Sequence, residues 1–211
     1  MGLTGKNNEE KAWNFLKGKI KNDFGVSGLM GELFAESGLN PQNLQNSYEK
    51  KLGFTDATYT AAVDSGSYAN FVHDSAGYGV AQWTFWSRKE ALLNYVRALG
   101  ASIGDLEAQL GFLYKELSES YPSVLAALKT ATSVRAASDK VLTDFERPAD
   151  QSEAVKIKRA SYGQTYYDKY AKAAASTPSE GGNNMSNSPL VNCTVKSPNH
   201  SAVSYTHLRA H

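Results

Sequence analysis

The sequence contains very little cysteine. Cys193 is the only one among the 211 residues, so no disulfide framework stabilises the fold, and no cysteine–histidine set has the spacing of a structural zinc site. Stability must therefore come from side-chain packing, and a chain with 41% hydrophobic and 11% aromatic residues is long enough for one well-buried domain. We accordingly predict no metal site and no cofactor.

The chain also lacks long apolar runs and an excess of one charge. No stretch of about 18 apolar residues occurs, and the N-terminus lacks the charged segment and apolar core of a secretory signal. We predict neither a signal peptide nor insertion into a membrane. The formal net charge is +1 with no long basic run, which argues against a nucleic-acid partner bound mainly through its phosphates.

Helical periodicity is what the sequence has in abundance. The most regular pattern runs from about Val26 to Ser37, with apolar residues at spacings of three and four before Gly38 and Pro41 end the helix. Further helices are predicted at six places: from about Asn8, from a capping box at Ser87, over the leucines of 106–117, after Pro122, over the apolar residues of 134–145, and from a cap at Asp150 to about Tyr170.

Between residues 40 and 79 the pattern weakens. Gly, Asn, Asp and Ser are frequent there, which predicts an irregular lobe with one short helix starting at Thr55. The sequence thus predicts an all-α domain over residues 1–175, with a helical core and this lobe. Residues 176–189 have the small, polar composition of a flexible linker. Residues 190–211 are too few to bury a core, so we expect a disordered C-terminal tail.

Glu36 is the first candidate catalytic residue. At about 100° per residue it projects beside Leu29 and Leu33 at the margin of the apolar stripe, whereas Glu32 points roughly 40° further toward solvent. Partial burial and the negative end of the helix dipole would both raise the pKa of Glu36, as a general acid requires. On position alone, an ordinary helix-end carboxylate is the more common situation.

Two motifs narrow the interpretation. The helix ends in Ala35-Glu-Ser-Gly-Leu-Asn-Pro41, and Gly77-Tyr-Gly-Val-Ala-Gln-Trp-Thr84 follows about forty residues later. This pair resembles goose-type lysozymes, lytic transglycosylases and, most closely, phage tail-tip lysozymes. The last group also resembles the chain in Phe145-Glu-Arg-Pro148 and Arg159-Ala-Ser-Tyr-Gly163. The resemblance covers about residues 8 to 172 and implies a lysozyme-like fold.

By this resemblance Glu36 is the catalytic acid, and Asp74 is the second catalytic candidate. An aspartate shortly before the Gly-to-Gln motif positions the attacking water in the goose-type pattern, and Asp74 occupies a comparable place. The structural alternative for Asp74 is an Asx-turn in a loop rich in Gly and Ser. A further aspartate of that pattern is unmatched, because Thr84 stands there, and Asp64 or Glu49 rank below Asp74 as substitutes.

The same motifs supply residues for substrate contact. Gln82 offers amide donors and acceptors to sugar hydroxyls, and Tyr78 and Trp83 offer aromatic faces to pyranose rings, with core packing as the alternative for both rings. Ser37 completes the predicted substrate-binding set. We interpret Glu146-Arg147 as a structural ion pair or cap.

The resemblance implies a peptidoglycan hydrolase of the muramidase type, from a phage tail lysin or endolysin. It would cleave β-1,4 bonds between N-acetylmuramic acid and N-acetylglucosamine, acting as a monomer on glycan strands of the bacterial cell wall, either in the virion or after release. Two alternatives stay open. One is a lytic transglycosylase, which uses one Glu and leaves anhydro-muramyl ends, and the other is a non-catalytic module that binds the wall or builds the tail.

The C-terminal residues carry a second resemblance. Residues 188–201 resemble the opening of a zinc-dependent N-acetylmuramoyl-L-alanine amidase domain, and residues 202–211 resemble a translated adaptor sequence. We therefore expect residues 190–211 to be a truncated remnant of an amidase-like domain followed by non-native residues, without amidase activity.

Overall fold

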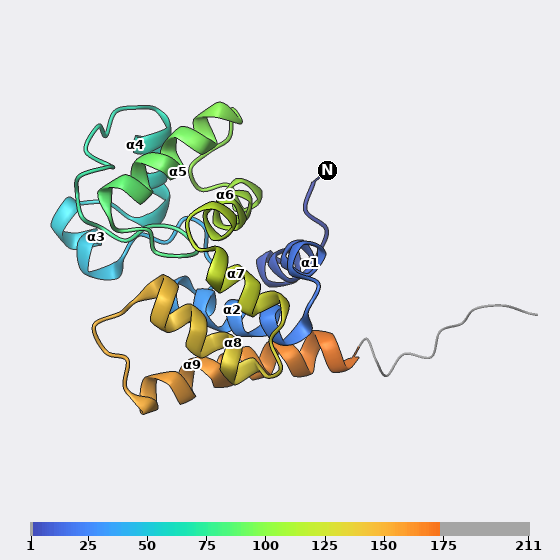
Figure 1. Cartoon of the computed structure of the whole chain (residues 1–211). Helices are drawn as coiled ribbons and strands as arrows, with labels where there is room; N and C mark the ends of the chain where they lie inside the picture. Colours follow the sequence, from blue (N-terminus) through green and yellow to red (C-terminus); the bar gives the residue numbers. More distant parts are fainter. Residues whose placement is uncertain (1, 174–211) are drawn as a thin grey trace, which may run out of the picture. The chain divides into compact units, whose positions relative to one another are not determined.

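Helices dominate residues 2–173, the part of the chain that the structure, a computed structural model, describes (Figure 1). Extended pairing within this part is limited to single bridges of Tyr78 with Leu44 and with Trp83, so the predicted all-α class is confirmed. No helix within it is long and apolar enough to cross a bilayer. The predicted linker and amidase-like remnant lie outside the described residues.

The helices follow one another with short connections except around the lobe. In chain order they are α1 (Asn8–Ile20), α2 (Asp23–Ser37), α3 (Asn46–Leu52), α4 (Asp56–Asp64), α5 (Trp86–Ala98), α6 (Leu106–Glu119), α7 (Pro122–Lys129), α8 (Val134–Val141), the π-helical turn η1 (Leu142–Glu146), α9 (Glu153–Tyr166) and the π-helical turn η2 (Tyr167–Lys172).

The central helix is α2, which contacts α1, α7, α8 and α9. Figure 1 shows α8 and α9 beside it. Because neighbours cover α2 on most sides, Val26, Leu29, Met30 and Leu33 have no exposed surface, whereas Phe34 near its end is 40% exposed. The helix starts three residues before the predicted Val26, since the Asn22 side chain accepts a hydrogen bond from Gly25 N and caps it. It ends as predicted at Gly38, whose φ of 61° suits glycine.

Two glycines set the separation of α2 and α9. A Cβ atom at Gly31 would lie 2.5 Å from the backbone N of Gly163, and a Cβ atom at Gly163 would lie 2.8 Å from the carbonyl O of Ser27. The two backbones therefore touch at this point, which a larger residue on either helix would prevent. This contact brings Arg159, one turn before Gly163, to the C-terminal half of α2.

The region predicted as an irregular lobe contains α3, α4 and a long loop up to α5. Thr55 caps α4 as predicted, through reciprocal hydrogen bonds with Thr58. Aromatic rings fill the interior of the lobe, where the ring of Tyr59 lies 6.1 Å from that of Phe71 and 5.3 Å from that of Tyr78. The lobe thus has an apolar core of its own beneath an irregular backbone.

Two predicted helix starts are wrong. Ser87 lies inside the first turn of α5, which begins at Trp86 without a side-chain cap. Asp150 precedes α9, and Ser152 caps that helix by accepting a hydrogen bond from Val155 N. In both places the sequence motif has the right composition, but the backbone enters the helix one to three residues away from it.

Candidate active site

Glu36 lies in the last turn of α2, and its side chain keeps 20% of its surface exposed. Arg159 of α9 donates from Nη1 to Oε1 of Glu36 at 2.5 Å. The same nitrogen donates to Oε2 of Glu32 at 2.8 Å. Arg159 thus holds two carboxylates of α2 that stand one helical turn apart. It also lines a cavity of about 300 Å³ at the surface, together with Phe34, Ala35, Val155, Lys158 and Tyr162.

The predicted exposures of the two glutamates are corrected by the structure. Glu32 was expected to point further toward solvent than Glu36, yet its side chain has no exposed surface. The reason is that α8 and α9 cover the flank of α2 which a helix with a single apolar face would leave open. Ser138 of α8 donates to Oε1 of Glu32 at 2.6 Å, and burial, the largest effect, raises the pKa of Glu32.

Glu146, at the end of η1, is a third carboxyl group in this region. Its Oε1 atom is buried and has no hydrogen-bond partner, although the residue as a whole keeps some exposed surface. Burial, followed by repulsion from Glu36, raises the pKa of Glu146 well above its ordinary value, while Arg88 and Arg159 oppose the rise. The structure therefore brings the carboxyl groups of Glu32, Glu36 and Glu146 into one electrostatic cluster.

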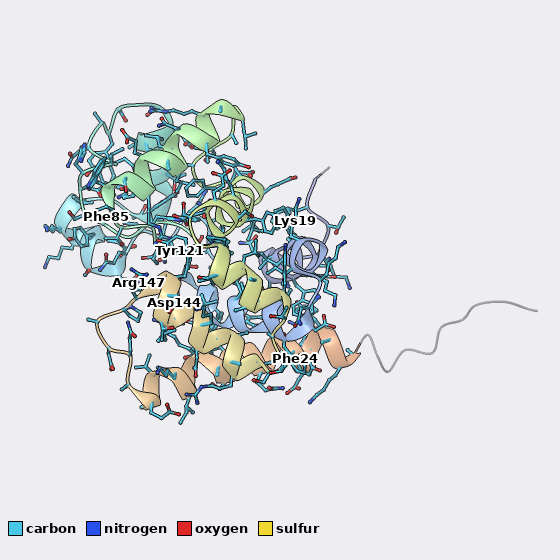
Figure 2. All side chains as sticks on the ribbon, viewed as in Figure 1. Lys19, Phe24, Phe85, Tyr121, Asp144 and Arg147 are labelled. Atoms are coloured by element: carbon cyan, nitrogen blue, oxygen red, sulfur yellow. The ribbon has the colours of Figure 1, made fainter. Side chains whose placement is uncertain are left out.

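The predicted ion pair between Glu146 and Arg147 is wrong. Arg147 is exposed and donates from Nε to the carbonyl O of Asp144 at 3.1 Å (Figure 2 labels both residues). The cap interpretation fits better, because Arg147 has a left-handed φ of 51° and its backbone N donates to Leu142 O, which ends η1.

A second arginine connects η1 to the lobe. Arg88 of α5 binds the Glu116 carboxylate with two hydrogen bonds, at 2.6 and 2.8 Å, and its guanidinium lies 4.7 Å from the ring centroid of Phe145. Trp83 donates from Nε1 to the same Glu116 at 3.0 Å. The two motifs around Trp83 and Phe145, which are about sixty residues apart, therefore meet through Arg88 and Glu116.

Asp74 lies in a different network inside the lobe. Its side chain has no exposed surface and forms an ion pair of 2.5 Å with the equally buried Lys89. Tyr59 and Tyr68 donate to Oδ2 at 2.5 and 3.1 Å, and Ala76 N donates to Oδ1 at 2.9 Å. Both oxygens are thus occupied and shielded from water. The structure thus places Asp74 in the interior of the lobe, and the bond from Ala76 N is the turn-forming bond of its structural alternative.

The predicted substrate-binding residues divide into buried and accessible positions. Tyr78 and Trp83 have no exposed surface and belong to the core. Ser37 is nearly buried and donates to Leu33 O at 3.1 Å and to Val80 O at 3.0 Å, which ties the end of α2 to the second motif. Gln82 is half-buried, and its amide nitrogen donates to the side chain of Asn43 at 2.8 Å.

The accessible aromatic rings come directly after the second motif. Phe85 and Trp86 are 61% and 50% exposed, and their ring centroids lie 6.0 Å apart. With His73, Ser75, Thr84 and Val72 they line a cavity of about 440 Å³. The sequence analysis did not identify these rings as candidates, because the sequence does not indicate whether an apolar residue at a helix start is buried or exposed.

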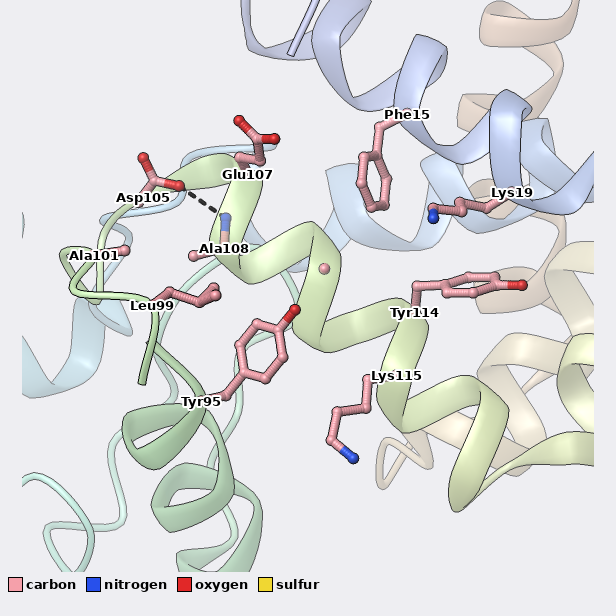
Figure 3. Close-up of a pocket in the computed structure, with 11 residues that line it drawn as sticks. Phe15, Lys19, Tyr95, Leu99, Ala101, Asp105, Glu107, Ala108, Tyr114 and Lys115 are labelled. Atoms are coloured by element: carbon pink, nitrogen blue, oxygen red, sulfur yellow. Dashed lines mark hydrogen bonds between the residues drawn. The ribbon is translucent and has the colours of Figure 1, made fainter. Parts of the chain in front are cut away.

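A cavity of about 610 Å³ lies away from these residues, between α1, α5 and α6. Figure 3 shows Phe15, Tyr95 and Tyr114 around it, with Lys19 and Lys115 at its edge. None of the predicted site residues lines it. The two carboxylates in its lining, Asp105 and Glu107, stand at the start of α6, where Asp105 caps the helix by accepting a hydrogen bond from Ala108 N.

Residues 7–170 match the family model described as phage tail lysozyme. The chain belongs to this family. Membership of the phage tail lysozymes implies action on the peptidoglycan of the bacterial cell wall, which the domain lyses. No curated protein and no solved structure matches the chain. The family match stops before the amidase-like residues.

Proposed function

We propose that this phage tail lysozyme acts as a monomeric muramidase that cleaves β-1,4 bonds of glycan strands, with Glu36 as the general acid. One observation supports the assignment above all. In the carboxyl pair bound by Arg159, the side chain of Glu36 is 20% exposed, whereas that of Glu32 is fully buried. A general acid must come within hydrogen-bond distance of the bridging oxygen, and Glu36 is the member of the pair that a substrate reaches.

Arg159 orients the acid in this proposal. Its bonds to Glu32 and Glu36 hold the Glu36 carboxyl in one position, and the close contact of Gly31 with Gly163 fixes the helix that carries Arg159. Cleavage begins when the carboxyl of Glu36, in its protonated form, gives its proton to the bridging oxygen, so that the leaving sugar departs as an alcohol.

A lytic transglycosylase is the second candidate, and the burial of Asp74 favours it. Inverting hydrolysis needs a second carboxylate that activates water, at about 6.5–9.5 Å from the acid. Asp74 is fully engaged by Lys89 and two tyrosines. A transglycosylase needs only the acid, because a hydroxyl group of the muramic acid attacks the same sugar and forms the anhydro product.

For substrate contact we propose Gln82 and the exposed rings of Phe85 and Trp86. Pyranose rings pack against aromatic faces, and buried rings such as Tyr78 and Trp83 cannot offer them. Gln82 is half-buried and stands two positions before Thr84, which lines the same cavity as these rings. Ser37 then acts by holding the end of α2 against Val80 rather than by touching the sugar.

The deciding experiment compares the wild-type chain with Glu36→Gln on isolated cell walls, with the products identified by mass spectrometry. We expect muropeptides with reducing ends from the wild type and at least about a hundredfold slower release from Glu36→Gln, since general acid catalysis contributes about 10²–10⁴-fold. Glu119→Gln, which removes an exposed carboxylate of α6, is the matched control and should cleave like the wild type.

The other outcomes separate the alternatives. Anhydro-muramyl ends identify the transglycosylase. Binding to walls without any release of fragments by the wild type indicates a non-catalytic module and refutes the proposal. Full activity of Glu36→Gln removes Glu36 as the acid.

A further inference from the structure

The carboxyl group of Glu146 is placed where a negative charge is poorly tolerated. Its Oε1 atom is buried and accepts no hydrogen bond. An ionised carboxylate with a buried, unpaired oxygen loses its hydration without compensation, whereas a protonated carboxyl group tolerates the same place far better. The geometry therefore favours a Glu146 that holds a proton.

The charges that surround Glu146 lead to the same result. The charged groups with the largest electrostatic effect on Glu146 are Glu32 and Glu36 of α2, Arg159 of α9 and Arg88 of α5. Arg88 is already matched by its two hydrogen bonds to Glu116. Of the two cations that act on Glu146, only Arg159 therefore remains to compensate the three carboxyl groups. Like charges at short range cannot all ionise, so the cluster retains at least one proton in a pH range where isolated carboxyl groups have lost theirs.

Glu36 is the member of the cluster that binds the arginine and reaches the surface. Arg159 donates to it at 2.5 Å, an interaction that needs the carboxylate as acceptor. Glu32 is satisfied by Ser138 and Arg159. Glu146, which has a buried oxygen without a donor, is the remaining place for the proton. Burial and the repulsion by Glu36 raise the pKa of Glu146 in accord with this distribution.

We propose that Glu146 is a positioning residue of the active site whose carboxyl group stores the proton that Glu36 delivers to the glycosidic oxygen. The inference rests on the proposed role of Glu36. The proton passes from Glu146 to the Glu36 carboxylate as substrate binds, and from Glu36 to the bridging oxygen as the C–O bond breaks. The nucleophile, water or a sugar hydroxyl, releases one proton when it attacks, and that proton restores the cluster.

The test is the pH profile of wall cleavage by the full chain, measured for wild type, Glu146→Gln, Glu146→Asp and the control Glu119→Gln. Gln is a neutral isostere without a transferable acid proton. With one carboxyl group fewer in the cluster, the last proton leaves at lower pH, so the alkaline limb of the Glu146→Gln profile should move by about one pH unit toward acid. Activity should fall about tenfold at pH 7 and stay within about threefold of wild type at pH 5. Glu146→Asp, which keeps a carboxyl group, should recover most of the alkaline limb.

The proposal is overturned if the alkaline limb of Glu146→Gln stays at the wild-type position. It is also overturned if activity falls equally at every pH, because a purely structural defect would lower activity without shifting the limb. A wild type that cleaves no walls at any pH refutes the proposed function instead. Carbon NMR of the Glu146 carboxyl in the wild type gives an answer even if the variants do not fold. Titration well above the ordinary value of about 4.3 supports a stored proton, and titration near that value excludes it.

Discussion

Arg159 and Glu36 are separated by 123 residues in the chain, yet a hydrogen bond of 2.5 Å joins them. The bond connects α9 to the last turn of α2, and the same arginine nitrogen binds the buried Glu32. A mechanical role and an electrostatic role are thus combined in one side chain. It orients the exposed carboxyl group and compensates the buried one.

Arg159→Gln should therefore affect both stability and turnover. Removing one partner of a buried ion pair costs about 3 kcal/mol, because the remaining charge stays desolvated. We expect that loss in urea unfolding at pH 7 and a smaller loss as the pH falls, because the raised pKa of Glu32 favours its neutral form, which needs no cation. Arg159→Lys keeps the charge and should retain most of the stability while cleaving at least about tenfold more slowly. Equal activity of Arg159→Lys and wild type would exclude the orienting role.

Asp74→Asn distinguishes a structural from a catalytic Asp74. The substitution leaves the Lys89 ammonium buried without its counter-charge, and we expect the free energy of unfolding to fall by about 3 kcal/mol. Lys89→Met should lower the free energy of unfolding by a similar amount. The double variant, Asp74→Asn with Lys89→Met, should lower it by less than the sum of the two single effects. A stable Asp74→Asn protein that no longer cleaves walls would instead assign Asp74 to catalysis.

Gly163→Ala tests the contact between α2 and α9. The added Cβ would lie 2.8 Å from Ser27 O, which forces the helices apart, and overpacking of this kind costs about 1–3 kcal/mol. Cleavage should decrease as well, since Arg159 moves with α9. Gly18→Ala is the matched control, because nothing lies within 4 Å of its Cβ on the exposed side of α1, and it should gain about 0.5–1 kcal/mol in thermal unfolding.

Trp86→Ala should weaken binding to cell walls without destabilising the fold. The ring is 50% exposed, so its removal leaves no internal cavity, whereas the loss of a stacking face should raise the dissociation constant for purified glycan fragments about threefold to tenfold. Ile157→Ala removes a similarly exposed apolar side chain from α9 and should bind like the wild type. Unchanged binding by Trp86→Ala in calorimetry would place the glycan strand elsewhere.

The raised pKa of Glu146 also predicts how stability depends on pH. A carboxyl group whose pKa is higher in the folded than in the unfolded state stabilises the fold below its ordinary pKa, and this contribution is lost as the pH rises through the folded value. The Glu146→Gln variant has no carboxyl group at this position, so it does not lose this contribution as the pH rises. Its stability relative to wild type should therefore increase from pH 5 toward pH 8, by up to about 1.4 kcal/mol per pH unit. A constant difference across this range would show that Glu146 titrates normally.

The sequence alone predicted most of the helices, although not α3, and it supplied Glu36 as the proposed acid. Apolar spacing located α1, α2 and α6, because helix formation responds to residues three and four positions apart, and Gly38 determined the end of α2 through its left-handed backbone. The family motifs at residues 35–41 and 77–84 indicated Glu36 and the class of substrate. These features depend on neighbouring residues or on residue identity, and they can therefore be recognised without knowledge of the fold.

The surroundings of Glu36 depended on tertiary structure. Whether a carboxyl group is buried is decided by which helix covers it, so Glu32 became the interior residue once α8 and α9 were packed on α2. In the same way Lys89, a residue of the helix predicted from Ser87, became the buried partner of Asp74. The helical period determines direction around one axis only. The meeting of Glu36, Glu146 and Arg159 required the long-range packing of three separate helical segments, because no spacing within the chain encodes it.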